Sequence, residues 1–421
     1  MSTTLLFALL GALTALAFGA RQLFRRTRVP DIIVLMATGV LLGPILGLVK
    51  GSQFEPVTYT LGTLAFILIL FEGGLELDLR MVLRHFPGGL LLSFLAYVFS
   101  VIAIALVMRW SMHIPTTTAL IVGAVLGCTS SSITLPVLQQ IETSTPGRVI
   151  MTLDASLSDT FAILTVGVLI DLGHSKELIA ARFLGQVLYV PFISCLLAII
   201  MAVAWSYLLP KVSDRRFRNP LTLAVVLLLY SAAEQVGVSG LITVFFFGIF
   251  LANVRRGELD LIKDSLGLKF AGEEHHAQLL TFHAELSFLV RTFFFVLLGA
   301  VVELRALIYY LPQVLGVLGV VILARALAVK ASSWSWNGLR APERELILWI
   351  MPRGLITVVL ALEVVQVRGS AFDFLPALAF ATILATNLMV IIGSFRASRI
   401  PQNADAFEPQ PEPEHPSVIA S

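Results

Sequence analysis

The sequence is a series of long apolar runs, each close to the length that spans a lipid bilayer. Of the 421 residues, 57% are hydrophobic and only 13% are charged. This composition excludes a soluble domain and is typical of a membrane protein with many spanning helices. Cys128 and Cys195 both lie in apolar runs, so we expect no disulfide framework. The first run, residues 4–20, lacks a basic leader and a small-residue cleavage site, and we interpret it as a spanning helix.

About 13 of these runs are predicted to be spanning helices, with boundaries good to a few residues. They lie near residues 3–23, 30–49, 57–76, 86–108, 117–140, 148–171, 180–209, 219–235, 237–254, 280–302, 306–331, 343–366 and 372–395. Residues 255–279 are predicted to form a polar loop or a surface helix. The Pro- and Glu-rich residues 400–421 are expected to be a disordered cytoplasmic tail.

The lysines and arginines of the loops gather on one side of the predicted membrane. Loops on that side carry clusters such as Arg25-Arg26 and Arg215-Arg216, whereas the opposite loops carry single residues such as Arg305. Because cytoplasmic loops are enriched in basic residues, this bias predicts an outside N-terminus and a cytoplasmic C-terminus. We expect the membrane to be a bacterial inner membrane. Such an orientation requires an odd number of spans.

Two of the predicted spans are interrupted by helix-breaking residues. The fifth contains residues 128–132 (CTSSS) followed by Pro136, and the twelfth contains Pro352-Arg353-Gly354. A count of about 13 divides into six, one and six, which gives two inverted six-helix repeats in which these two spans hold corresponding places. Paired broken helices indicate a transporter with an ion site near the bilayer midplane. The alternative is two ordinary kinks, since Pro and Gly are common in membrane helices.

Two carboxylates, Asp154 and Asp159, lie in the sixth run, within residues 151–166 (MTLDASLSDTFAILTV). A charge at bilayer depth costs several kcal/mol, so it is rarely present without a partner or a function. Five residues separate the two acids, which places them about 140° apart around a helix. Asp154 therefore shares a face with Ser158, and Asp159 shares one with Ser156.

Asp159 is the candidate ion-binding group. Carboxylate and hydroxyl oxygens suit small hard cations. A carboxylate in a partly dry cavity can hold a proton or a cation but not both well, and this competition couples two fluxes. The broken fifth span adds Thr129, Ser130 and Ser131, whose hydroxyls and freed carbonyls can complete the shell of a cation. Alternatively, these hydroxyls bond back to their own helix.

Two arginines lie in or beside the predicted spans of the C-terminal half. Arg325 is permanently charged at bilayer depth and needs a counter-charge, for which Asp154 is the candidate. Arg353, next to Gly354, either balances the C-terminal end of a helix or points to water. We interpret Glu285 and Arg291 as interfacial residues. The remaining acids near span ends receive no role: Glu72, Glu234 and Glu363.

With these motifs in place, residues 1–399 resemble the monovalent cation:proton antiporter superfamily. LDASLSDTFAIL is similar to the family's E-S-L-L-N-D segment: Asp154 falls on the Glu, Ser158 on the Asn, and Asp159 on the essential ion-binding Asp. Further similar segments are FEGGLELDL in the third span, ILARALAVK around Arg325, and PRGLITVVLAL with Arg353 and Gly354.

The sequence departs from the family pattern at three places near the predicted site. The T-D-P of the first broken helix is here Thr129-Ser130-Ser131, which lacks the acid and looks more like the potassium-efflux branch. Ser158 replaces the Asn. Ala155 replaces the Ser that follows the Glu, with Ser156 as a stand-in. The resemblance therefore leaves the choice between Na⁺ and K⁺ open, with Na⁺ as our first expectation.

The sequence and the resemblance together predict an all-α antiporter with two crossed discontinuous helices. The core is expected at residues 86–172 and 306–399, and a dimerisation part at 1–85 and 173–305. We expect electroneutral exchange of Na⁺ or K⁺ for H⁺ by an elevator-like motion, in a homodimer surrounded by lipid. We expect no enzymatic activity, no cofactor and no nucleic-acid partner. The alternatives are an anion or organic-acid transporter that uses Arg325 and Arg353, a passive channel, and an intramembrane protease, whose G-x-G-D motif is absent from the sequence.

Overall fold

The computed structural model is helical wherever the chain is described. It describes residues 3–27, 31–48, 55–138, 141, 143–171, 179–255, 273–302, 304–336, 339 and 341–397, and these contain no strand. Helices follow from the apolar runs because lipid offers no hydrogen bonds, so each backbone group must be satisfied within its own segment. By length and composition, eight described helices can cross a membrane, and two shorter apolar helices accompany them. The predicted count of 13 spans and the inverted repeats stay predictions.

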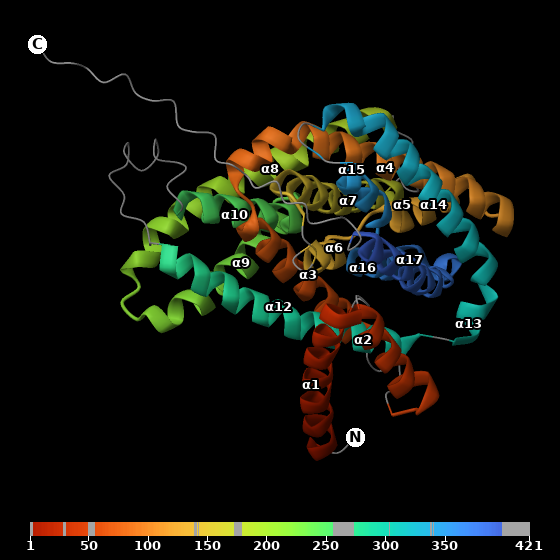
Figure 1. Cartoon of the computed structure of the whole chain (residues 1–421), viewed down its shortest axis with the longest axis horizontal. Coiled ribbons are helices and arrows are strands. Elements are labelled where there is room, and N and C mark those ends of the chain that lie inside the picture. Colours follow the sequence, from red (N-terminus) through yellow and green to blue (C-terminus); the bar gives the residue numbers. More distant parts are fainter. Residues whose placement is uncertain are drawn as a thin grey trace, which may run out of the picture.

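One set of helices, the core group, surrounds the two interrupted segments. Its members are α4 (Leu79–Met112), α5 (Thr116–Gly127), α6 (Ser131–Leu138), α7 (Thr145–Asp171), α13 (Leu304–Tyr309), α14 (Leu311–Ser332), α15 (Ala341–Trp349), α16 (Leu355–Arg368) and α17 (Leu375–Ala397). Helix α4 packs along α5, α7 and α14, and α17 packs against α14, α15 and α16. Figure 1 shows α6, α16 and α17 near the centre of the molecule, and α16 packs against α17.

The other helices form the flanking group. They are α1 (Thr3–Thr27), α2 (Asp31–Val40) with the π-helical turn Leu41–Ile45, α3 (Glu55–Glu76), α8 (Ile179–Leu208), α9 (Arg218–Gln235), α10 (Gly240–Arg255) and α12 (Glu273–Val301). Helix α10 packs against α3 and α8, and α12 packs against α2 and α3. The two groups meet mainly where α3 contacts α6 and α16, and where α7 contacts α8. Helix α1 projects away from the bundle (Figure 1).

Glycines bring helices of the flanking group into backbone contact. A Cβ on Gly74 of α3 would collide with Phe245 O of α10, and it would lie 3.1 Å from the Cα of Gly248. A Cβ on Gly299 of α12 would lie 3.0 Å from the Cα of Gly39 in α2. Small residues let membrane helices approach this closely, and dispersion contacts then stabilise their packing.

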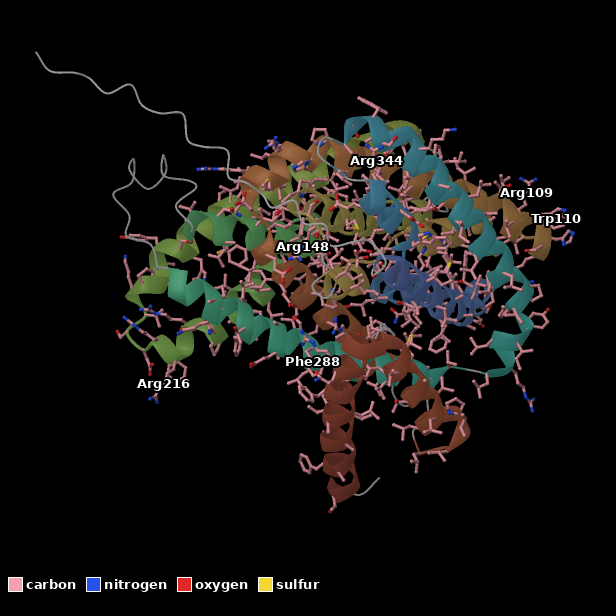
Figure 2. All side chains as sticks on the ribbon, in the orientation of Figure 1. Arg109, Trp110, Arg148, Arg216, Phe288 and Arg344 are labelled. Atoms are coloured by element: carbon pink, nitrogen blue, oxygen red, sulfur yellow. The ribbon has the colours of Figure 1, made fainter. Side chains whose placement is uncertain are left out.

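Several helices extend beyond the apolar runs from which they were predicted. Helix α4 begins at Leu79 rather than near residue 86, and α12 begins at Glu273 rather than near residue 280. Figure 2 shows Arg109 and Trp110 at one edge of the bundle and Arg216 at the opposite edge. The Trp110 side chain is 83% exposed. The predicted tail, residues 400–421, and most of the predicted loop at 255–279 lie outside the described residues.

Candidate functional site

Both interruptions predicted from the sequence are present, and they lie against each other. Helix α5 ends at Gly127 and α6 begins at Ser131, while α15 ends at Trp349 and α16 begins at Leu355. The backbone N–H of Ser130 donates to the carbonyl of Pro352 at 2.8 Å. The interruptions are therefore true breaks rather than kinks, and a hydrogen bond joins the two breaks directly.

Asp159 of α7 binds the first break at Ser131, the first residue of α6. Its Oδ2 accepts hydrogen bonds from the N–H of Ser131 at 3.0 Å and from the Ser131 hydroxyl at 2.6 Å. Negative charge is stabilised at a helix N-terminus, where the first N–H groups have no intrahelical partner. Asp159 is only 1% exposed. Its second oxygen, Oδ1, is buried and has no hydrogen-bond partner among the described residues, so it can still bind an ion or a proton.

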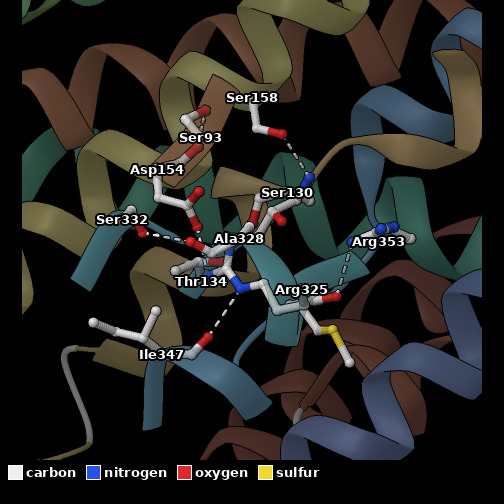
Figure 3. Close-up of polar contacts among 12 residues, drawn as sticks. Ser93, Ser130, Thr134, Asp154, Ser158, Arg325, Ala328, Ser332, Ile347 and Arg353 are labelled. Carbon is white, nitrogen blue, oxygen red and sulfur yellow. Dashed lines mark hydrogen bonds and ion pairs between the residues drawn. The ribbon is translucent and has the colours of Figure 1, made fainter. Parts of the chain in front are cut away.

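The neighbouring Ser158 holds the same break two residues earlier, at Thr129. Its Oγ accepts a hydrogen bond from the N–H of Thr129 at 2.9 Å, which Figure 3 shows as a dashed line. Consecutive residues of α7 thus bind consecutive parts of the break. This bond and the Ser131–Asp159 pair fix the loop between α5 and α6 to the helix that carries the carboxylate.

Asp154 and Arg325 form an ion pair between α7 and α14. Arg325 Nη2 lies 2.7 Å from Asp154 Oδ2, and each side chain is 2% exposed. Arg325 Nε also donates to the carbonyl of Ile347 at 3.0 Å, and the Ser93 hydroxyl donates to the backbone carbonyl of Asp154 at 3.0 Å. Figure 3 shows Arg325 between Asp154 and Ile347. The sequence-based choice of Asp154 as the counter-charge agrees with this geometry.

Arg353 balances the C-terminal end of a helix, which was one of the two alternatives. Its Nε donates to Leu126 O, in the last turn of α5, at 2.8 Å, and its Nη1 donates to Met351 O at 3.1 Å. The residue is 1% exposed, so it does not point to water. A guanidinium at this end satisfies carbonyls that α5 leaves unpaired and opposes the negative end of the helix dipole.

The serines of the first break bond across it rather than back to their own helix. The hydroxyls of Ser130 and Ser132 are 2.8 Å apart, and Ser132 Oγ accepts from the N–H of Leu355, the first residue of α16, at 3.3 Å. A Cβ on Gly354 would lie 2.5 Å from Ser130 Oγ and 2.8 Å from Ser132 Oγ, so only glycine fits between them. Ser156 does not join this network: its buried hydroxyl has no partner in the part of the chain that the structure describes.

Sequence reasoning missed one buried ion pair and two polar residues of α17. Arg291 is 7% exposed, and its Nη2 lies 3.1 Å from Asp31 Oδ2, which ties α12 to α2. Its place at the membrane interface stays a prediction. Asp31 was not singled out, although an acid at the start of an apolar run was a usable signal. Thr386 and Asn387 of α17 were also missed, and both bond the second break. Glu285 is exposed, in agreement with an interfacial place.

A cavity of about 490 Å³ lies between the core and flanking groups. Its lining includes Glu76 at the end of α3, Asp78 just before α4, and Arg148 and Thr152 of α7. Thr152 precedes Asp159 by seven residues, which is two turns and about 10 Å along the same face of α7. The cavity therefore lies beside the face of α7 that carries Asp159, and Asp159 is two turns further along the helix than Thr152.

Residues 10–400 match the family described as sodium/hydrogen exchanger, transmembrane. The chain is 22% identical to Na(+)/H(+) antiporter 1 of Methanocaldococcus jannaschii over 92% of this chain and 90% of the relative. It is also 22% identical to K(+)/H(+) antiporter NhaP2 of a Shewanella species, over 91% of this chain and 65% of the relative. The solved structure of the sodium proton antiporter MjNhaP1 from Methanocaldococcus jannaschii at pH 8 superimposes with a TM-score of 0.76. That match covers 95% of this chain and 99% of MjNhaP1 at 19% identity.

Proposed function

Because the chain belongs to the sodium/hydrogen exchanger family, with the match extending over residues 10–400, we propose that it exchanges Na⁺ or K⁺ for H⁺ across the membrane, with Asp159 as the shared carrier. The observation that carries this proposal is the state of the Asp159 carboxylate. One of its oxygens is held by Ser131, while the other is buried and unpaired by any described residue. That second oxygen is able to take a proton or a cation, and occupation by one excludes the other.

The oxygens around Asp159 match the needs of a small monovalent cation. Carboxylate, hydroxyl and backbone carbonyl oxygens are hard ligands. We infer that Asp159 Oδ1 is the charged ligand and that oxygens of Thr129, Ser130, Ser131 and Ser158 complete the shell when the cation is bound. Ser156 remains a candidate, because its hydroxyl is buried on the same helix as Asp159. The relatives named above include a Na⁺/H⁺ and a K⁺/H⁺ antiporter, so either cation is compatible with the proposal.

The rival function, transport of an anion or organic acid, has little support in the charges. Such a transporter would need a cationic group that is free to bind substrate. Arg325 is paired with Asp154, and Arg353 donates to two backbone carbonyls. The charge of Arg325 is thus already neutralised, although its Nη1 has no hydrogen-bond partner among the described residues, and the Arg353 guanidinium is held at the end of a helix. Asp159 forms no ion pair with any described residue and keeps one carboxylate oxygen unpaired.

We further propose that the core group moves against the flanking group in an elevator-like motion, and that the flanking group forms the homodimer. The few contacts between the two groups, compared with the extensive packing within each, support this division. The core predicted from the sequence, residues 86–172 and 306–399, and the predicted dimerisation part belong to this proposal. The inverted repeats, the outside N-terminus and the bacterial inner membrane belong to the same proposal.

The proposed function is tested with purified protein in proteoliposomes that carry a preset proton gradient and a pH-sensitive dye. We expect Na⁺, K⁺ or Li⁺ to dissipate the gradient with the wild-type protein. Asp159→Asn, which removes the charge and keeps the shape, should lower the exchange rate at least 100-fold while the protein stays folded. Glu285→Gln is the matched control, because Glu285 is an exposed acid on α12. Exchange by folded Asp159→Asn at the wild-type rate would refute the assignment of the carrier.

A further inference from the structure

Two neighbouring side chains of α17, Thr386 and Asn387, hold the backbone of Arg353 in the second break. Both are 0% exposed. The N–H of Arg353 donates to Thr386 Oγ1 at 3.0 Å, and the carbonyl of Arg353 accepts from Asn387 Nδ2 at 3.1 Å. Arg353 lies between α15 and α16 and has no helical partners, so α17 satisfies both backbone groups that the break leaves open.

The remaining hydrogen bonds of these side chains fix their orientation. Thr386 donates its hydroxyl hydrogen to Thr382 O at 2.8 Å, and Asn387 Nδ2 donates its other hydrogen to Ile383 O at 2.7 Å. A hydroxyl carries one hydrogen and an amide nitrogen two, so all donors are used. Turning the Asn387 amide over would place its oxygen against two carbonyl oxygens. The two side chains therefore present a fixed acceptor and a fixed donor to Arg353.

The Arg353 backbone that α17 holds is connected to the candidate ion site at two places. The guanidinium of Arg353 binds Leu126 O in the last turn of α5, two residues before the first break starts at Cys128. The residue before Arg353, Pro352, accepts from the N–H of Ser130 inside that break. A rotation of the Arg353 peptide would therefore displace the buried guanidinium charge of Arg353. It would also displace the backbone segment that borders Thr129 and Ser131.

We propose that Thr386 and Asn387 are positioning residues for the cation site, which set the geometry of both breaks through the backbone of Arg353. This inference rests on the proposed function, since it concerns the site built around Asp159. Neither residue bonds Asp159, so each acts through Arg353 rather than on the ion. Loss of either bond frees the Arg353 peptide to rotate and weakens cation binding more than it slows turnover.

The test compares substitutions that keep the volume and remove the polar group: Thr386→Val and Asn387→Leu. The matched control is Thr382→Val, because Thr382 is equally buried on α17 and its hydroxyl bonds only Leu378 O of its own helix. Thr386→Ser keeps the hydroxyl and should restore wild-type behaviour. We expect the KM for the cation to rise about fivefold in each test variant, as the loss of one hydrogen bond implies, with kcat changed less than twofold. Thr382→Val should leave KM within twofold of the wild type.

Hydrogen–deuterium exchange of residues 350–354 supplies a readout that does not depend on transport. The N–H of Arg353 should exchange at least fivefold faster in Thr386→Val than in Thr382→Val. Equal hydrogen–deuterium exchange rates at Arg353 in these two variants would overturn the positioning role. A fall in kcat with unchanged KM would also overturn it. If the wild-type protein moves no cation, the proposed function fails. In that case the hydrogen–deuterium exchange rate at residues 350–354 still decides whether α17 holds the break.

Discussion

At the scale of single residues, the Asp154–Arg325 pair gives a direct prediction about stability. Removing one member leaves a buried charge without its partner, which costs about 3–5 kcal/mol for buried pairs. Asp154→Asn or Arg325→Leu alone should therefore lower the melting temperature in detergent. The double variant should recover part of the loss, because neither charge is then stranded, and a double-mutant cycle measures this coupling.

The Asp31–Arg291 pair provides the comparison for that cycle, since it is also buried but joins α2 to α12 within the flanking group. Asp31→Asn should also lower stability, yet it should leave the cation dependence of exchange unchanged. If the losses from the Asp154 and Arg325 variants simply add, the pair is not coupled. Asp154 would then have to be considered as a second proton carrier.

Sequence alone could identify the acids of the site but not all of their partners. Asp154, Asp159 and Arg325 stand out because each is a charge within an apolar run, where an unpaired charge is costly. Thr386 and Asn387 do not stand out, because a polar side chain within a helix can satisfy itself by bonding its own carbonyls. Which of them faces a break depends on how α17 is rotated and packed, and the apolar pattern of that run does not fix the rotation.

At the scale of helices, the contact between α3 and α10 should tolerate no side chain at Gly74. Gly74→Ala would drive a Cβ into the backbone of α10, and overpacking of this kind costs about 1–3 kcal/mol. Gly319→Ala in α14 is the control, because no atom lies within 4 Å of the Cβ it would add. We expect Gly74→Ala to lower the melting temperature and Gly319→Ala to leave it unchanged or raise it, since Ala favours a helix over Gly by about 1 kcal/mol. Equal melting temperatures would contradict the close contact.

The helices themselves followed from the apolar runs, whereas their first turns did not. Helix α4 was predicted from about residue 86, yet it begins at Leu79, where Asp78 accepts a hydrogen bond from the N–H of Met81 at 3.0 Å. Asp is a favoured N-cap, and the polar turn that follows it continues the helix beyond the apolar run. A prediction from apolar residues covers only the part of a helix that lies in lipid, so it places the start of such a helix too late.

At the scale of the whole molecule, exchange should be electroneutral, with one monovalent cation moved for one proton. Asp154 is neutralised by Arg325, whereas Asp159 forms no ion pair with any described residue, so Asp159 is the acid proposed to carry the exchanged charge. The exchange rate should therefore not depend on an imposed membrane potential. This is measured in proteoliposomes clamped with valinomycin and K⁺, with Na⁺ or Li⁺ as the substrate. A rate that follows the voltage would show that a second charge is carried.

The proposed elevator-like motion predicts that a cross-link between the two groups of helices stops exchange. Gly73 of α3 and Leu135 of α6 face each other across the boundary: the Cγ of Leu135, where a cysteine sulfur would lie, is 3.8 Å from a Cβ built on Gly73. In a background without Cys128 and Cys195, oxidation of Gly73→Cys/Leu135→Cys should abolish exchange, and dithiothreitol should restore it.

A second disulfide, placed within the core group, separates this prediction from a general effect of cross-linking. Val107→Cys/Gly316→Cys joins α4 to α14, where the Val107 Cγ1 lies 3.0 Å from a Cβ built on Gly316. The core group moves as a unit in the proposed mechanism, so this disulfide should form without loss of exchange. Full activity of the completely oxidised Gly73→Cys/Leu135→Cys protein would mean that α3 and α6 do not move apart during transport. The division of the molecule into moving and fixed helices would then have to be drawn elsewhere.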